Sequence, residues 1–263
     1  MIKKSILLPA VSALVLITAS CASTGNNNPH EDNDTLESYN RAVFKFNYQV
    51  DKYVLKPIAE GYRDITSESV RERVNSVLLN TKEPLFAINN ILQGNFKASG
   101  ISVGRFIINT TLGLGGAFDV AKGWGFPRET QTFDDTLAQW NVPDGPFVVL
   151  PFIGPSTPRA ATSLVLAMAT DPVYWATRND ANVRDKINYT YTAVEAIALR
   201  ERTLDLLNEL ERGSVDYYST MRSAYLQNRK NKGGGNAEND AQSYDFDFGV
   251  EDEDEAFNDM EDE

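Results

Sequence analysis

Cysteine and histidine are almost absent, since the 263 residues contain one of each. One cysteine excludes an internal disulfide framework and any cysteine-rich zinc module. One histidine excludes an HExxH zinc site, and every Ser-His-Asp or Cys-His triad would have to use His30. Because His30 stands in the polar run STGNNNPHEDN, we expect it to be solvated. The sequence therefore predicts no catalytic residue, no metal and no cofactor.

Long hydrophobic runs are also lacking, because no stretch of 18 uncharged apolar residues follows residue 20. We expect no conventional hydrophobic helix to span a membrane in the mature chain. Residues 1–20 instead resemble a signal peptide, with Lys3 and Lys4 before an apolar run that is too short to span a bilayer comfortably.

The predicted signal peptide ends at Thr18-Ala19-Ser20-Cys21, which resembles a bacterial lipobox. Cys21 is therefore predicted to be lipidated; the alternative is an ordinary small-x-small cleavage site with a chance cysteine. A lipidated cysteine carries more acyl chains than stable anchoring needs. Ala22, in place of the Asp that retains many lipoproteins at the inner membrane, predicts a lipid anchor in the outer membrane, on its periplasmic side.

Positive charge is missing from residues 233–263, which hold 13 acids and no Lys or Arg. With Lys3 and Lys4 set aside, 23 of the 25 bases and 24 of the 37 acids lie in the rest of the chain, which is nearly neutral. The net charge of −12 argues against a nucleic-acid partner. We expect a lipidated flexible tether at 21–33, a folded body at 34–232 and a disordered acidic tail at 233–263.

Hydrophobic residues recur at three- and four-residue steps through most of the body, a spacing typical of amphipathic helices. Pro57 is expected to end the first helix, Pro84 to begin the third, and Gly94 to stop it. The predicted helices are about 34–55, one starting at Ser67 or Ser69, 84–93, 96–110, 160–169, 182–212 and 215–227.

The stretch 112–158 is different, because it holds seven glycines and six prolines yet remains strongly apolar. Irregular apolar backbone is expected either to pack over a core or to line a cavity at membrane depth. The helix predicted at 160–169 is apolar nearly all round, so we expect it to be buried or dipped in lipid.

Several motifs occur in one order along the body. They include Asp34-Thr-Leu-Glu37 followed by Asn40-Arg41 and Phe44-x-Phe46-Asn47, then Leu92-Gln93-Gly94, Arg105-Phe106-Ile-Ile-Asn109-Thr-Thr-Leu-Gly113-Leu-Gly115-Gly116, Leu150-Pro151 and Gly154-Pro155-Ser156. This set closely resembles the signature of the MlaA/VacJ lipoprotein family and covers about 34–232.

The resemblance implies an all-α fold, a ring-shaped arrangement of amphipathic helices with irregular Gly/Pro-rich apolar loops around an amphipathic channel. It also implies an outer-membrane lipoprotein that removes mislocalised phospholipids from the outer leaflet and passes them to an MlaC-type periplasmic carrier, beside a trimeric porin. This transport maintains lipid asymmetry and requires no enzymatic step.

Candidate residues follow from the same resemblance and from charge. Arg105 and Arg159 are phosphate contacts or structural ion pairs, and Asn40 and Asn47 share a helix face from which they can hydrogen-bond irregular backbone. The channel and lipid-binding candidates are Asn40, Phe44, Asn47, Arg105, Phe133, Trp140, Phe147 and Arg159. Gly145 is a candidate loop hinge, since Asp134, Ala138, Asn141 and Pro143 stand where glycine is common in the family.

Two other functions stay open from the residues alone. An envelope scaffold that organises porins or assembly machinery needs no lipid channel. An envelope hydrolase would need a pair of carboxylates such as Asp134-Asp135, although adjacent acids usually face solvent. The apolar, Gly/Pro-broken middle favours transport over a scaffold, because a scaffold has no need of apolar loops.

Overall fold

The computed structural model describes residues 34–177 and 181–233. The predicted signal peptide, Cys21, the tether with His30 and nearly all of the acidic tail lie outside the described residues. Helices dominate the described part, so the helical fold class is confirmed. A two-stranded sheet adds a feature that the sequence did not predict.

The first predicted helix is longer than expected, because Pro57 does not end it. Helix α2 (Glu37–Val50) continues through the π-helical turn η1 (Asp51–Leu55) into α3 (Lys56–Ile65). The Lys56 N–H donates to the Asp51 carbonyl, five residues back. This wide turn leaves Pro57 in the first turn of α3, where its missing N–H costs little.

Helix α4 (Glu68–Leu92) is one helix of 25 residues with Pro84 inside it, so the prediction of two helices with Pro84 at the start of the second is wrong. An interior proline costs about 3 kcal/mol, and α4 offsets this by packing against α5 (Phe96–Thr111). Gly94 does stop the helix as predicted. It has φ +79°, and the Asn95 N–H donates to the Asn90 carbonyl at 2.8 Å.

The Gly/Pro-rich stretch contains two short helices, α6 (Val120–Gly123) and α7 (Phe133–Gln139), and the antiparallel hairpin of β1 (Val148–Leu150) and β2 (Gly154–Ser156). Its register pairs Val148 with Ser156 and Leu150 with Gly154. The chain then forms α8 (Pro158–Thr170), α9 (Pro172–Thr177), α10 (Ala181–Arg202), α11 (Leu204–Gly213) and α12 (Tyr217–Gly233).

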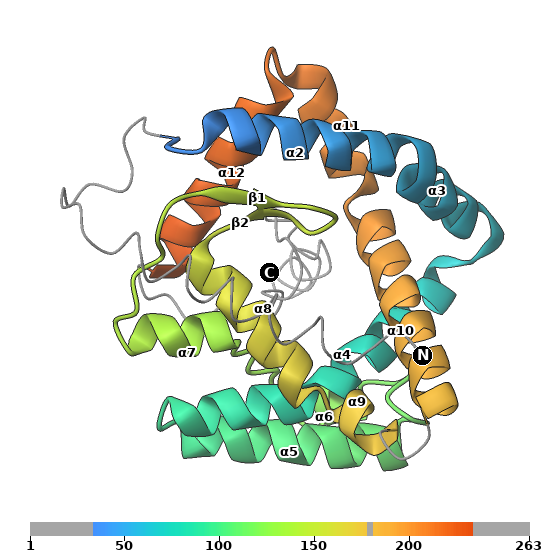
Figure 1. The fold of residues 1–263 in the computed structure, drawn as a ribbon. Helices are drawn as coiled ribbons and strands as arrows, with labels where there is room; N and C mark the ends of the chain where they lie inside the picture. Colours follow the sequence, from blue (N-terminus) through green and yellow to red (C-terminus); the bar gives the residue numbers. More distant parts are fainter. Residues whose placement is uncertain (1–33, 178–180, 234–263) are drawn as a thin grey trace, which may run out of the picture.

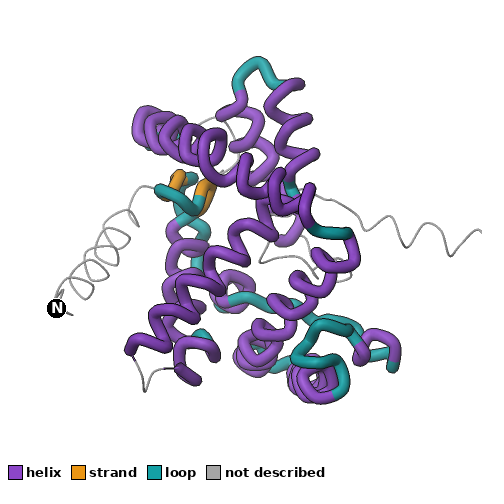
Figure 2. The backbone as a smooth tube through the Cα atoms, turned by 90° about the vertical axis from the view of Figure 1, so that its right-hand side faces the viewer, coloured by secondary structure: helices purple, strands orange, loops and turns teal. Residues whose placement is uncertain are grey.

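These helices form a ring (Figure 1). Helices α2 and α3 lie along one side, α10 along the next, the α4–α5 pair along the base, and α7 with α12 on the remaining side. The β1–β2 hairpin and α8 lie within this frame. Turned by 90°, the molecule shows the strands tucked beneath a helix at its edge (Figure 2). Phe147, Val149 and Tyr218 form a buried core between the hairpin and α12.

Helix α8 is apolar but is not a buried helix, because only Ala161 and Ser163 are buried. Leu166 and Met168 on the same helix are exposed. Of the two alternatives for this segment, the buried helix is therefore wrong for the isolated chain. No helix within 34–177 and 181–233 is both long and apolar enough to cross a membrane.

Candidate functional site

Helix α5 turns its polar face inward and its apolar face outward. Its buried residues, spaced three and four apart, are Ala98, Ser99, Ser102, Arg105 and Asn109. On the opposite face Phe96 is 71% exposed and Ile107 is 55% exposed, and Val103 lies between them. In a helix packed on a protein core the two faces are normally reversed. The apolar face of α5 therefore has no partner within the described chain.

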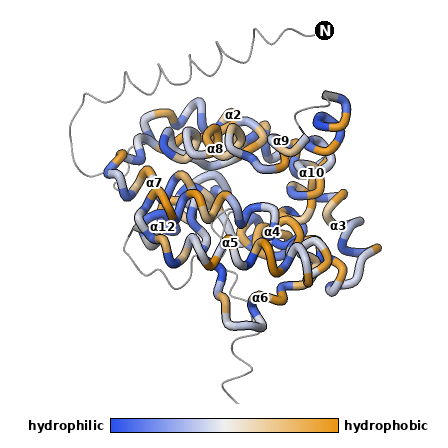
Figure 3. The backbone as a smooth tube through the Cα atoms, turned by 90° about the horizontal axis from the view of Figure 1, so that it is seen from below, coloured by the Kyte–Doolittle hydropathy of each residue, from blue (hydrophilic) through white to orange (hydrophobic). Residues whose placement is uncertain are grey.

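The adjoining half of α4 shares this polarity. Ile88, Ile91 and Leu92 are exposed, whereas Glu83, Asn89 and Asn90 are buried together with Leu85 and Phe86. Between residues 84 and 112 the only charged residues are Lys97 and the buried Arg105. We call residues 83–112, the second half of α4 with α5, the inverted hairpin. Figure 3 shows hydrophobic and hydrophilic residues alternating along α4 and α5.

A buried ion cluster lies at the centre of the inverted hairpin. Arg105 is 1% exposed, and its Nε donates to Glu83 Oε1 at 2.8 Å while Nη2 donates to Asp119 Oδ2 at 2.6 Å. Arg128 Nε donates to the same Glu83 oxygen at 2.9 Å. Two positive and two negative groups balance, so the cluster is buried without net charge.

The pKa shifts of Asp119 and Arg105 favour the charged form of both groups. Burial alone would raise the pKa of Asp119, but the hydrogen bond and the attraction from Arg105 hold it below its usual value. Burial would lower the pKa of Arg105, and the attraction of Glu83 with hydrogen bonds to both acids raises it instead. The structural ion pair, one of the two predicted roles of Arg105, is the arrangement observed. A phosphate could not reach this guanidinium in the described conformation.

Amide side chains extend the polar interior toward α7. Thr136 Oγ1 donates to Asn89 Oδ1 at 2.8 Å, and Gln93 Nε2 donates to Thr136 Oγ1 at 2.9 Å. Asn90 Nδ2 donates to the Glu129 carbonyl at 3.1 Å. The bond from Asn90 satisfies a carbonyl of irregular backbone, and the other two satisfy polar side chains on α4 and α7.

Asn40 and Asn47 hold the β1–β2 hairpin against α2, which is the kind of bond that their spacing predicted. Asn40 is fully buried; it accepts from the Val149 N–H at 2.8 Å and donates to the Phe147 carbonyl at 3.2 Å. Two helical turns further along α2, Asn47 donates to the Leu150 carbonyl and accepts from the Phe152 N–H, both at 2.8 Å. The two amides thus replace a third strand along β1.

The predicted aromatic candidates divide by exposure. Phe44 packs edge-on against Tyr217 and Tyr218, with ring centroids 5.4 and 5.5 Å apart. Phe147 and Phe133 are each 7% exposed. These three phenylalanines therefore pack inside the protein, and Trp140 is the one aromatic candidate with an exposed side chain.

Arg159 lies in a second ion cluster, which ties α7, α8 and α12 together. Its Nε contacts Asp134 Oδ1 at 3.0 Å and its Nη2 contacts Asp144 Oδ1 at 2.7 Å. Arg229 binds both of these acids from α12. The ion-pair alternative for Arg159 is again the one observed, and Asp134 is bound by both arginines.

The loop after α7 is tightly shaped at two positions. Asn141 has φ +61° and closes α7, with the Val142 N–H donating to the Leu137 carbonyl at 2.9 Å. Asparagine tolerates this left-handed conformation better than other residues with a side chain. Gly145 has φ +77°, and a Cβ there would lie 2.9 Å from Pro158 Cγ. Gly145 is thus a required turn residue; its role as a hinge stays a prediction.

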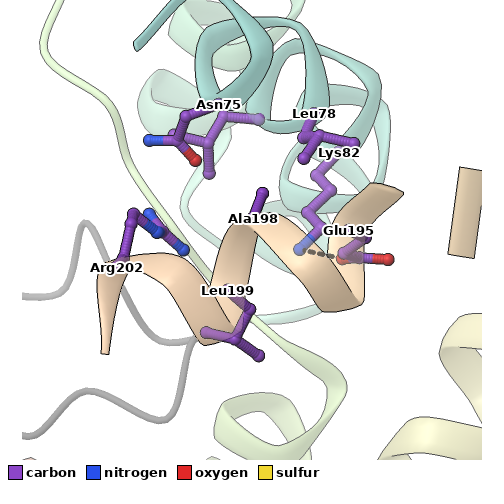
Figure 4. Close-up of a pocket in the computed structure, with 8 residues that line it drawn as sticks. Asn75, Leu78, Lys82, Glu195, Ala198, Leu199 and Arg202 are labelled. Atoms are coloured by element: carbon purple, nitrogen blue, oxygen red, sulfur yellow. Dashed lines mark ion pairs between the residues drawn. The ribbon is translucent and has the colours of Figure 1, made fainter. Parts of the chain in front are cut away.

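A small pocket lies between α4 and α10 (Figure 4). Leu78 and Ala198 line it, and Lys82 Nζ contacts Glu195 Oε1 at 2.6 Å across it. Its enclosed volume of about 10 Å³ admits little more than a water molecule. This pocket is too small for a lipid chain, so the outward apolar face is the stronger candidate surface.

The fold and this surface define a helical ring protein whose longest hairpin has a polar interior and an apolar exterior. The chain belongs to the MlaA lipoprotein family, whose model matches residues 32–232. It is 41% identical over 198 residues to an uncharacterized protein of Rickettsia felis, covering 75% of this chain and 76% of that one.

Named relatives are also similar over most of their length. The intermembrane phospholipid transport system lipoprotein MlaA of Haemophilus influenzae is 33% identical, with 86% of this chain and 88% of the relative covered. The protein of the same name in Escherichia coli is 33% identical, with 82% and 86% covered. A solved structure, from work on the structural basis for maintenance of bacterial outer membrane lipid asymmetry, superimposes with a TM-score of 0.65 at 32% identity, covering 77% of this chain and all of that one.

Sequence reasoning missed the polar interior of the inverted hairpin. The prediction of a helix at 96–110 rested on apolar residues that include Val103 and Ile107, and it did not say which face of the helix is buried; both of these residues are exposed. A signal was present, because Ser99, Ser102, Arg105 and Asn109 also have helical spacing. Glu83, Asp119 and Arg128 had no comparable signal, because their partners come from separate elements.

Proposed function

We propose that this chain takes mislocalised phospholipids from the outer leaflet of the outer membrane and passes them to a periplasmic carrier. Transport of phospholipid that maintains lipid asymmetry is the function of the family to which the chain belongs. The observation that carries the proposal is the inverted hairpin. Its apolar outer face and polar interior suit a helix pair surrounded by lipid rather than by water.

The anchoring and the site of action are part of the same proposal. Acylated Cys21 would hold the chain on the periplasmic side of the outer membrane, and the inverted hairpin would seat the ring among the acyl chains. The amphipathic channel would lie within the ring, where apolar surface offsets the cost of about 0.8 kcal/mol for each methylene group exposed to water. No covalent step is required, so the protein would act as a transporter and not as an enzyme.

Two partners complete the proposed pathway. An MlaC-type carrier would receive phospholipid at the periplasmic face, and a trimeric porin would hold the ring in the membrane. Support for these partners is the family membership, and the acidic tail at 233–263 has no partner assigned to it.

Lipid mass spectrometry tests the proposal. The full-length protein is purified in detergent, its bound lipid is quantified, and labelled phospholipid is then offered to an MlaC-type carrier without ATP. We expect phospholipid in a fixed ratio to protein and its handover to the carrier. Protein stripped of lipid by repeated detergent exchange is the control. Empty protein that hands over nothing, yet co-purifies with a porin, would favour the scaffold.

A further inference from the structure

The turn of the β1–β2 hairpin contains a bulky apolar residue in a backbone conformation that suits glycine. Phe152 has φ +65°, and the residue is 74% exposed. The left-handed conformation is unfavourable for a bulky residue, and exposing a phenyl ring to water is unfavourable as well. Glycine would remove both costs. Strain combined with exposure points to a function for this side chain.

Neighbouring residues fix the turn in this conformation. Asn47 Nδ2 donates to the Leu150 carbonyl at 2.8 Å, and the Phe152 N–H donates to Asn47 Oδ1 at 2.8 Å. The adjacent residue of α2, Phe46, meets the ring of Phe152 edge-on with centroids 5.2 Å apart. The amide of Asn47 therefore bonds only backbone atoms of the hairpin, and the phenyl ring stays apolar and accessible.

The β1–β2 hairpin has a clear direction relative to the ring of helices. Figure 1 shows the hairpin beneath α2, with its turn directed into the space that the helices encircle. Phe46 is itself 46% exposed, so the two rings form an apolar pair that the other described residues leave open. An exposed apolar pair at this turn has the chemistry to contact a hydrocarbon chain.

We propose that Phe152, braced by Phe46, contacts phospholipid acyl chains inside the ring, and that Asn47 is a positioning residue that presents it. This inference rests on the proposed function and names the residues that meet the transported lipid. Contact with an acyl chain would compensate for the strain and exposure of Phe152.

Photo-crosslinking tests the contact directly. p-Benzoylphenylalanine is placed at Phe152 or at Val215, an exposed apolar residue between α11 and α12, in the full-length protein. The probe is radiolabelled phosphatidylethanolamine in detergent. We expect about fivefold more labelling at position 152 than at position 215, because a fivefold ratio corresponds to the free energy of a partial apolar contact. Equal labelling at both positions would overturn the inference.

Phe152→Gly separates the functional role from a structural one. Glycine relieves the strained turn, so we expect an unchanged or higher melting temperature together with about fivefold less retained phospholipid. Val215→Ala is the matched control, for which we expect wild-type lipid content. Asn47→Ala is expected to reduce crosslinking from position 152 while helix content is kept.

The outcomes are distinguishable. Wild-type lipid retention in Phe152→Gly would overturn this inference and leave the proposed function standing. A wild-type protein that retains no phospholipid would overturn both. A lower melting temperature of Phe152→Gly with unchanged lipid would show that the ring of Phe152 serves only folding.

Discussion

Two regions of the molecule use opposite arrangements of polar and apolar side chains. Around the β1–β2 hairpin, Phe147, Val149 and Tyr218 are buried, as in an ordinary water-soluble core. In the inverted hairpin, Glu83 and Arg105 are buried and Ile107 is exposed. Amides that bond backbone pair the buried polar groups of the first region, and in the second an ion cluster pairs Arg105 with Glu83 and Asp119. The contrast indicates that the two regions face different surroundings.

The largest expected effect tests the ion cluster. Arg105→Met leaves Glu83 buried beside Arg128 with one partner fewer, and we expect a loss of about 4 kcal/mol of unfolding free energy. Denaturant unfolding in detergent, followed by circular dichroism, measures it. Removing both charges, as Glu83→Leu with Arg105→Met, should recover part of this loss. A double variant no more stable than the single one would contradict the role of charge balance.

A somewhat smaller loss of unfolding free energy is expected in the region around the β1–β2 hairpin. Asn40→Ala leaves the Val149 N–H and the Phe147 carbonyl without their partner, at a cost of about 3 kcal/mol. Asn40→Asp keeps the acceptor but puts a second buried carboxylate beside Asp34 Oδ1, to which Asn40 Nδ2 donates at 2.8 Å, so we expect this variant to be no more stable than Asn40→Ala. The same unfolding measurement applies. Equal stability of Asn40→Ala and wild type would show that α2 does not hold the hairpin.

The third prediction concerns the exposed face itself. Ile107→Ser should change the unfolding free energy in detergent by less than about 1 kcal/mol, because the side chain has few protein contacts to lose. Phe86→Ala, which truncates a fully buried residue of α4, should cost about 3 kcal/mol. A loss in Ile107→Ser as large as that in Phe86→Ala would contradict the inverted polarity.

The smallest effect is a pH dependence at the surface. A hydrogen bond from Arg41, with another from Ser219, lowers the pKa of Asp216 to about 2. A lowered carboxyl pKa stabilises the fold above the usual value of about 4, and the contribution is lost as pH falls toward 2. Melting temperatures between pH 5 and pH 2 should fall less in Asp216→Asn than in wild type. Identical slopes would contradict the pairing.

Local features of the fold could be predicted from the sequence, whereas contacts between residues far apart in the sequence could not. Gly94 and the helix after it follow from turn chemistry and hydrophobic spacing. Pro57 and Pro84 misled the prediction, because a π-helical turn and tertiary packing accommodate them. The bond between Asn40 and Val149 joins residues 109 positions apart, which no local pattern encodes.

Hydrophobic spacing also left the direction of an apolar face undecided. The period of α5 identifies two faces, one with Val103 and Ile107 and the other with Arg105 and Asn109. It gives no information on which face meets protein and which meets the surroundings. That choice depends on Glu83 and Asp119, whose approach to Arg105 only the folded chain reveals.

Spin-label accessibility is the measurement that tests the proposed lipid-facing hairpin most directly. One label replaces Ile107 on α5, and another replaces Arg212, an exposed residue of α11, in full-length protein reconstituted into phospholipid bilayers. We expect oxygen, which concentrates in lipid, to relax the label at 107, and a water-soluble nickel complex to relax the label at 212. Strong relaxation of the label at 107 by nickel, at the level of the label at 212, would contradict this expectation.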